Sequence, residues 1–477
     1  MLYSYNTVID GFAVRLRREE LESLKAKEGF LHAYPDRVYH LQTPHTPGFL
    51  GLSPKHGLWP RTVSGKGTII GIVDTGIWPE HPSLNSTGML PPPERWRGLC
   101  IDAGPDFNLS HCNNKLIGAR VSDSPLDELG HGTHTATTAA GRVRAPGRQV
   151  WQVVCAAGNF SPAKSTLGNE APWMPTVGAS TLDREIRSAT KLGNGKIYRG
   201  QLLFQPGNFQ PALVPLVYPG SNGDYLSTIC SDGQLTVDAV SGKVVLCEAT
   251  GRDEVEKGEI VLRAGGMAMI LMSTGAQDYD TIADAHVLLT SQAYINSTEH
   301  PMATILFKGT AYRDVVVPMV ASFSYRGPSF RSPGILKLDI IGPGESILAG
   351  WPPNIGPTID LEDQRRVVFN ILSGTSMSAP HLSGVTALLK SAHPKWSPAA
   401  MMTTADTLKN EGKPITDQTQ NPAGVITGSH VHCSNKTSIS EGELNYPSFT
   451  VIFTSSGPST ITLKRTVTNV GVATKWR

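Results

Sequence analysis

A small-residue turn, Gly374-Thr375-Ser376-Met377-Ser378-Ala379-Pro380-His381, runs directly into an apolar segment over residues 382–389. The apolar residues of that segment recur every three or four positions, which predicts a helix. Pro380 fits the first turn of such a helix, where its missing N–H costs nothing. Ser376 would then lie at the helix N-terminus, beside backbone N–H groups without a helical partner. Those donors suit an oxyanion on an attacked carbonyl, although a Ser/Thr cap with no chemistry stays an open alternative.

Two other stretches supply an acid and an imidazole. Residues 67–73, Gly-Thr-Ile-Ile-Gly-Ile-Val, predict a buried parallel strand that ends at Asp74. The run Gly130-His131-Gly132-Thr133-His134 precedes a helix of small residues, so His131 would lie at the start of that helix. An Asp, a His and a Ser in such places are the parts of an acyl-transfer triad. The Ser attacks, the His moves its proton, and the Asp holds the imidazole tautomer.

The chain order Asp, His, Ser, together with these three motifs, resembles the subtilisin-like serine proteases. The same triad occurs in a different order on other folds, so the order is informative. Further matches favour the plant subtilase branch; they lie at residues 154–159, 322–329 and 389–394. The chain resembles a plant subtilase with internal deletions and truncated ends.

By this resemblance, Asp74, His131 and Ser376 form the catalytic triad, and Asn159 supplies the oxyanion-hole amide. The implied mechanism requires no metal and no other cofactor. Three further polar residues are expected to pack or form hydrogen bonds nearby without taking part in the chemistry: His134, Ser378 and His381. Two acidic residues ahead of the histidine are expected to lie in a solvated loop: Asp123 and Asp127.

The implied fold class is α/β, with a subtilisin-like parallel sheet flanked by helices. An α+β propeptide precedes the sheet, a protease-associated domain interrupts the catalytic domain, and a partial β module follows it. The resemblance gives five segments: residues 1–48 as an inhibitor-like propeptide, 49–204 as the first part of the catalytic domain, 205–312 as the inserted protease-associated domain, 313–430 as the second catalytic part, and 440–477 as an incomplete fibronectin type III-like module.

The chain departs from the family pattern most seriously after the His131 helix. Only residues 142–148 separate that helix from a predicted strand at residues 149–156. The family has several more strands there, including a central strand and a glycine-rich segment that binds substrate. Other gaps are expected before Tyr3, after Ala400 and before Cys433. A parallel sheet buried on both faces tolerates the loss of an interior strand badly.

These gaps leave a second hypothesis open beside a serine endopeptidase made as a zymogen. The chain could be a catalytically impaired or inactive remnant of such a protease. It could also be a binding or inhibitory protein that acts through its propeptide-like or inserted domain. The implied partners are a protein or peptide substrate, the chain's own propeptide, and a second copy that associates through the inserted domain.

The composition of the 477-residue chain is that of an ordinary protein with two or more domains. A net charge of +2 gives no case for nucleic acid or an anionic membrane as a partner. No apolar run approaches the length that spans a bilayer. The N-terminal residues lack the charged and apolar regions of a signal peptide, whereas the resemblance implies an extracellular, apoplastic glycoprotein.

Six cysteines are too few for a disulfide scaffold. Cys100 could pair with Cys112, and Cys230 with Cys247, whereas Cys155 is expected to be a buried free thiol and Cys433 has no evident partner. Glycosylation triplets fit a secreted chain but arise by chance as well; they begin at Asn85, Asn108, Asn296 and Asn435.

Overall fold

The computed structural model describes most of the chain between residues 45 and 418, and shorter pieces ahead of it. The described residues are 3–5, 11–13, 16–25, 27, 30, 45–53, 55–62, 65, 67–94, 96–120, 124–140, 153–159, 163–203, 205, 211–249, 254–273, 286–287, 292–295, 297–312, 315–331, 333–358, 363–418 and 462. Two compact units make up the chain, Met1–Pro44 and His45–Arg477. The first unit therefore ends four residues before the predicted boundary at residue 48.

The first unit combines a small sheet with a helix. Strand β1 (Tyr3–Tyr5) pairs antiparallel with β2 (Gly11–Ala13), and helix α1 (Arg18–Lys25) follows. These elements agree with the α+β character predicted for the N-terminal segment.

A five-stranded central sheet lies in the second unit, with β4 (Thr176–Ser180) in its middle. β4 pairs parallel with β3 (Cys155–Ala156) and β13 (Ile340–Pro343), and antiparallel with β12 (Met319–Val320). β12 in turn pairs parallel with β16 (Thr416–Asp417). All five residues of β4 are buried, which fits a strand covered on both faces.

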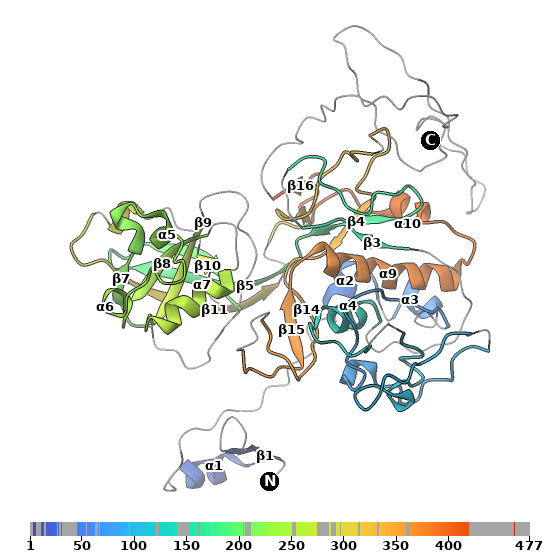
Figure 1. The fold of residues 1–477 in the computed structure, drawn as a ribbon, viewed down its shortest axis with the longest axis horizontal. Helices are drawn as coiled ribbons and strands as arrows, with labels where there is room; N and C mark the ends of the chain where they lie inside the picture. The colour runs from blue at the N-terminus through green and yellow to red at the C-terminus, as the bar shows by residue number, and fades with distance from the viewer. Residues whose placement is uncertain are drawn as a thin grey trace. The chain divides into compact units, whose positions relative to one another are not determined.

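Helix α9 (Thr375–Ala392) packs against the central sheet, and α4 (His131–Ala140) packs against α9 (Figure 1). Both helices were predicted and are confirmed. The apolar residues Val177, Leu382 and Met401 form the core between α9 and the sheet. The remaining elements around them are α2 (His45–Phe49), α3 (Leu58–Arg61), η1 (Pro82–Leu84), η2 (Leu109–His111), β14 (Ile347–Gly350), β15 (Phe369–Leu372) and α10 (Ala399–Thr404).

The strand predicted at residues 67–73 is not formed. Residues 69–73 make no hydrogen bond with any residue that the structure describes. Ile72 is 38% exposed and Val73 is fully exposed, whereas a buried strand would cover both. A β-strand exists only through the backbone bonds of its neighbours, and no described strand borders this segment. The sequence places a gap in the family pattern directly after α4, which accounts for a missing neighbour.

Seven described strands between Arg184 and Tyr312 form a closed barrel, drawn mostly in green in Figure 1. Its strands are β5 (Arg184–Leu192), β6 (Ile197–Gln201), β7 (Val214–Val217), β8 (Val244–Ala249), β9 (Ala268–Ser273), β10 (His286–Val287) and β11 (Met302–Tyr312), and its helices are η3 (Pro219–Asn222), α5 (Tyr225–Thr228), α6 (Val237–Val240), α7 (Glu254–Arg263) and α8 (Gln292–Ile295). The predicted boundary at 204/205 is wrong, because β5 and β6 pair with each other and β5 with β11.

The cysteine pairs follow the prediction. Cys100 bonds to Cys112, and Cys230 bonds to Cys247 inside the barrel. Cys155 is a free thiol as expected, although it is half-buried rather than buried. Cys433 and the module predicted at residues 440–477 lie outside the described residues, apart from Thr462. Among the described helices, none is both long enough and apolar enough to cross a bilayer.

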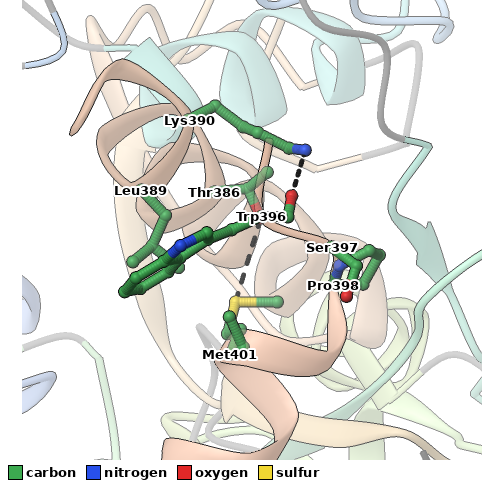
Figure 2. Close-up of a pocket in the computed structure, with 8 residues that line it drawn as sticks. Thr386, Leu389, Lys390, Trp396, Ser397, Pro398 and Met401 are labelled. Atoms are coloured by element: carbon green, nitrogen blue, oxygen red, sulfur yellow. Dashed lines mark hydrogen bonds between the residues drawn. The ribbon is translucent and has the colours of Figure 1, made fainter. Parts of the chain in front are cut away.

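Figure 2 shows how the shortened segment after Pro398 packs against α9. Helix α10 begins at Ala399 and ends at Thr404. Met401 is buried, with its sulfur 3.8 Å from the hydroxyl of Thr386 on α9. The cavity left between the two helices holds only about 10 Å³, roughly the space of one water molecule. The short helix α10 therefore packs closely against α9.

Candidate active site

Asp74 and His131 form a direct hydrogen bond at the start of α4. The Nδ1 atom of His131 lies 2.6 Å from Oδ1 of Asp74. The same carboxylate accepts the backbone N–H of Thr75 at 2.8 Å and the hydroxyl of Thr135 at 3.0 Å. The side chain of Asp74 is 14% exposed and that of His131 is 38% exposed. An Nδ1–H donated to the carboxylate leaves Nε2 as the acceptor on the open side of the ring.

The two groups shift each other's titration in opposite directions. The hydrogen bond from Asp74 raises the pKa of His131, against the opposing effect of burial, and the charges of Asp74 and Asp127 raise it further. Burial pushes the pKa of Asp74 upward, but the hydrogen bond and charge of His131, with the bonds from Thr75 and Thr135, hold it below its usual value. Both shifts favour the ionised pair.

Asp127 contradicts the prediction of a solvated acidic loop. Its side chain is completely buried and accepts four hydrogen bonds. The donors are the hydroxyl of Thr75 at 2.9 Å and the backbone N–H groups of Leu129 at 3.2 Å, Gly130 at 2.8 Å and Thr133 at 2.7 Å. The carboxylate satisfies N–H groups around the start of α4 that have no helical partner, which explains its burial. Asp123 lies outside the described residues.

Ser376 is half-buried in the first turn of α9, next to a polar pair. Its neighbour Thr375 donates its backbone N–H and its hydroxyl to Oδ1 of Asn159, each at 2.8 Å. The Thr375 hydroxyl in turn accepts the N–H of Gly158 at 3.0 Å. Because the oxygen of the Asn159 amide is bound in this way, its NH₂ group stays available for another acceptor.

The predicted site residues thus meet in two pairs. Asp74 is bonded to His131, and Asn159 is bonded to the residue that precedes Ser376. Between His131 and Ser376 the structure, in the part of the chain that it describes, has no hydrogen bond. The two residues lie on helices that pack against each other, α4 and α9. Hydrogen bonds of catalytic groups are often long in enzymes without substrate.

The three polar neighbours pack and form hydrogen bonds near the site, as predicted. His134 is fully buried with Nε2 3.0 Å from the carbonyl of Ile347, and burial lowers its pKa to about 3. Burial lowers the pKa of His381 to about 4, and its Nδ1 lies 2.8 Å from the carbonyl of Met377. Ser378 donates its hydroxyl to the carbonyl of Gly342 at 2.8 Å.

Sequence reasoning missed the polar residues that hold the site. Thr75 and Thr375 belong to the motifs, so their positions beside Asp74 and Ser376 could have drawn attention to them. No sequence signal distinguishes Thr135 or Asp127. Glu170 and Arg331 form an ion pair of 3.5 Å. Both residues line a cleft of about 570 Å³ whose other lining residues lie at 167–174, shortly after Asn159 in the sequence. Among the described residues, no group of three His, Cys, Asp or Glu side chains is placed to hold a metal ion.

Two family models match the chain. The subtilase family model matches residues 65–149 and 145–421, and the peptidase inhibitor I9 model matches residues 1–42. The subtilase match comes in two pieces that overlap at residues 145–149, at the end of the interval 142–148 where the sequence predicts a lost segment.

Curated relatives match nearly the whole chain. Subtilisin-like protease SBT1.2 of Arabidopsis thaliana is 35% identical, and the alignment covers 99% of this chain and 80% of the relative. SBT1.4 of the same plant has the same identity and coverage. The first alignment is 627 residues long, so about 155 of its positions have no residue in this chain. A solved subtilisin-like protease from Pseudoalteromonas sp. AS-11 covers 77% of this chain and 92% of its own, but at 13% identity and a TM-score of 0.30 it adds nothing to the assignment.

The family match and the curated relatives place the chain among serine peptidases of the subtilisin class. The chain belongs to the subtilase family, and its curated relatives are plant subtilisin-like proteases. It carries an N-terminal segment of the peptidase inhibitor I9 type.

Proposed function

We propose that this chain is a serine endopeptidase that hydrolyses peptide bonds through a triad of Asp74, His131 and Ser376. The observation that carries the proposal is the 2.6 Å bond between His131 and Asp74, which fixes the imidazole with Nε2 as the acceptor. Ser376 lies at the N-terminus of α9, the helix that packs against the helix of His131.

The reaction follows from these positions. Nε2 of His131 takes the hydroxyl proton of Ser376 as Oγ bonds to the substrate carbonyl carbon. His131 then gives this proton to the leaving amine as the C–N bond breaks. A water molecule next bonds to the acyl carbon while His131 takes one of its protons, and His131 returns that proton to Oγ of Ser376 as the C–Oγ bond breaks and the acid leaves. The oxyanion binds the NH₂ group of Asn159, whose oxygen is held by Thr375, and the backbone N–H of Ser376.

The other parts of the chain have proposed roles as well. Residues 1–48 act as an inhibitory propeptide that is cleaved off, so the enzyme is made as a zymogen. The barrel at residues 184–312 is a protease-associated domain that controls substrate access or self-association, and residues 440–477 start a fibronectin type III-like module. Secretion to the apoplast, with glycosylation, is supported by the disulfides Cys100–Cys112 and Cys230–Cys247, because such bonds persist in oxidising compartments.

Hydrolysis of dye-labelled casein by the purified chain, after residues 1–48 have been cleaved off, tests the function. Wild-type protein should release dye, and Ser376→Ala, which removes only the nucleophile, should release none above background. Ser383→Ala is the matched control, because Ser383 lies two turns further along α9 and donates its hydroxyl to the carbonyl of Ala379 on the same helix. If the folded wild-type chain and Ser376→Ala are equally inert, the inactive-remnant hypothesis holds instead.

A further inference from the structure

The Asp127 carboxylate contacts both segments that carry the Asp74–His131 pair. One segment is the turn at Asp74, where the hydroxyl of Thr75 donates to Oδ1 of Asp127 at 2.9 Å. The other is the start of α4, where the N–H of Gly130 donates to Oδ1 at 2.8 Å and that of Thr133 to Oδ2 at 2.7 Å. Those two N–H groups lie on either side of His131 in the sequence.

We propose that Asp127 is a positioning residue that holds Asp74 and His131 at hydrogen-bond distance. Its catalytic consequence rests on the proposed function, whereas the geometry that it maintains does not. Asp127 touches neither reacting group itself. It acts through Thr75 on one side and through the backbone of α4 on the other.

Thr75 joins the two segments through a single hydroxyl. This hydroxyl donates to Asp127 and accepts the N–H of Gly132 at 2.8 Å. Its own backbone N–H donates to Oδ1 of Asp74, the atom that also receives His131. A displacement of Asp127 would therefore move Asp74 through Thr75, and it would move His131 through the backbone at the start of α4.

Backbone packing leaves these segments no room to adjust. A side-chain carbon on Gly132 would collide with the carbonyl oxygen of Gly76, and one on Gly76 would lie 2.8 Å from Cα of Asp127. Gly76 also has a φ of +140°, a conformation that side chains rarely adopt. The close approach explains why a small change at Asp127 would be felt at the pair rather than absorbed nearby.

Two substitutions test this role on the full-length chain. Asp127→Asn keeps the shape but places an NH₂ group against one of the N–H donors, so at least one bond is lost. Thr75→Val keeps the carboxylate and removes both bonds of the hydroxyl. Asp224→Asn is the matched control, because Asp224 caps α5 in the barrel with bonds of 3.0 and 2.6 Å to Ser227 and contacts neither Asp74 nor His131.

Proton NMR of the imidazole N–H groups reads the pair directly, with the His131 signal assigned by its loss in His131→Ala. Wild-type protein and Asp224→Asn should show a downfield Nδ1–H signal from His131. Thr75→Val and Asp127→Asn should lose or shift that signal while circular dichroism stays unchanged. The titration midpoint of His131 should also fall in Asp127→Asn, because a nearby negative charge is removed. If Asp127→Asn does not fold, Thr75→Val alone decides.

The rate of fluorophosphonate labelling separates this proposal from the proposed function. Both variants should label about ten to a hundred times more slowly than wild type, as expected for a misplaced catalytic group. An altered NMR signal in a chain whose wild type does not label would support Asp127 and overturn the proposed function. An unchanged His131 signal and titration in both folded variants would overturn the positioning role, whatever the labelling shows.

Discussion

Thr375 donates both its backbone N–H and its hydroxyl to the side-chain oxygen of Asn159, each at 2.8 Å. Because both hydrogen bonds go to the oxygen, the NH₂ end of the Asn159 amide points away from Thr375. The same hydroxyl accepts the N–H of Gly158, so the residue before Asn159 is held by the residue before Ser376. The orientation of the proposed oxyanion donor is thus set from the nucleophile's own helix.

Removal of the Asn159 amide should impair turnover far more than binding. We expect Asn159→Ala to lower kcat by about 10²–10³ with little change in KM; this magnitude was measured for the corresponding donor of subtilisin, a relative. Thr375→Val, which removes one bond to Asn159, should lower kcat by roughly tenfold. Thr386→Val is the control, a buried threonine on the same helix whose hydroxyl lies 3.8 Å from the sulfur of Met401. Steady-state kinetics on a peptide substrate measure these effects, and an unchanged kcat in Asn159→Ala contradicts the assignment.

The exposed segment at residues 69–73 predicts an unusual tolerance to polar substitution. Val73→Thr should change the free energy of unfolding by less than about 0.5 kcal/mol, because the side chain is fully exposed. Val177→Thr in β4 should cost about 1–3 kcal/mol, because that site is completely buried and the new hydroxyl has no assured partner. Urea unfolding compares the two. Equal losses would mean that residues 69–73 form a buried strand after all.

The raised pKa of His131 predicts the pH dependence of acylation. Nε2 must be neutral to take a proton, so the labelling rate should rise with pH, with a midpoint above the ordinary value of about 6.5. The stability that protonated His131 contributes is present below pH 6.5 and is lost as pH rises through the raised pKa. The stability contributed by Asp74 is lost as pH falls through its lowered pKa. Labelling rates from pH 5 to 9, with Ser376→Ala as the blank, give the midpoint; a value below 6.5 contradicts the pair.

A buried ion pair beside the central sheet predicts a large loss on disruption. Lys337 and Asp339 have fully buried side chains and are bonded to each other. Lys337 also donates to the carbonyl of Met174 at 2.6 Å, and Asp339 accepts the N–H of Thr176 at 2.7 Å. Asp339→Ala should cost about 3–5 kcal/mol, because it leaves a buried ammonium without its partner. Lys413→Ala, which removes an exposed pair with Glu411, should cost less than about 1 kcal/mol in the same urea unfolding assay. Similar losses in the two variants would show that the buried pair is not formed.

Local patterns in the sequence predict the helices of the site well. The periodic segment after Pro380 forms α9, and the small-residue run after His131 forms α4. The Asp74–His131 bond also follows from the motifs, because each motif fixes a turn or helix start within a few residues.

Features that depend on segments distant in the chain could not be predicted from the local sequence. Residues 67–73 have the composition of a buried strand, but a strand needs neighbours, and the chain lacks one there. The sequence around Asp127 is typical of a surface loop. Its burial depends on the turn at Thr75, about fifty residues earlier, which the local sequence does not show. The local sequence of the β5–β6 hairpin does not distinguish it from other hairpins. The pairing of β5 with β11 shows that it belongs to the barrel.

Mass spectrometry of the chain after reaction with a fluorophosphonate tests the central claim most directly. The triad of Asp74, His131 and Ser376 predicts a single adduct on Ser376, absent in Ser376→Ala and strongly reduced in His131→Ala. No adduct on a folded wild-type chain, or equal labelling of wild type and His131→Ala, would contradict it.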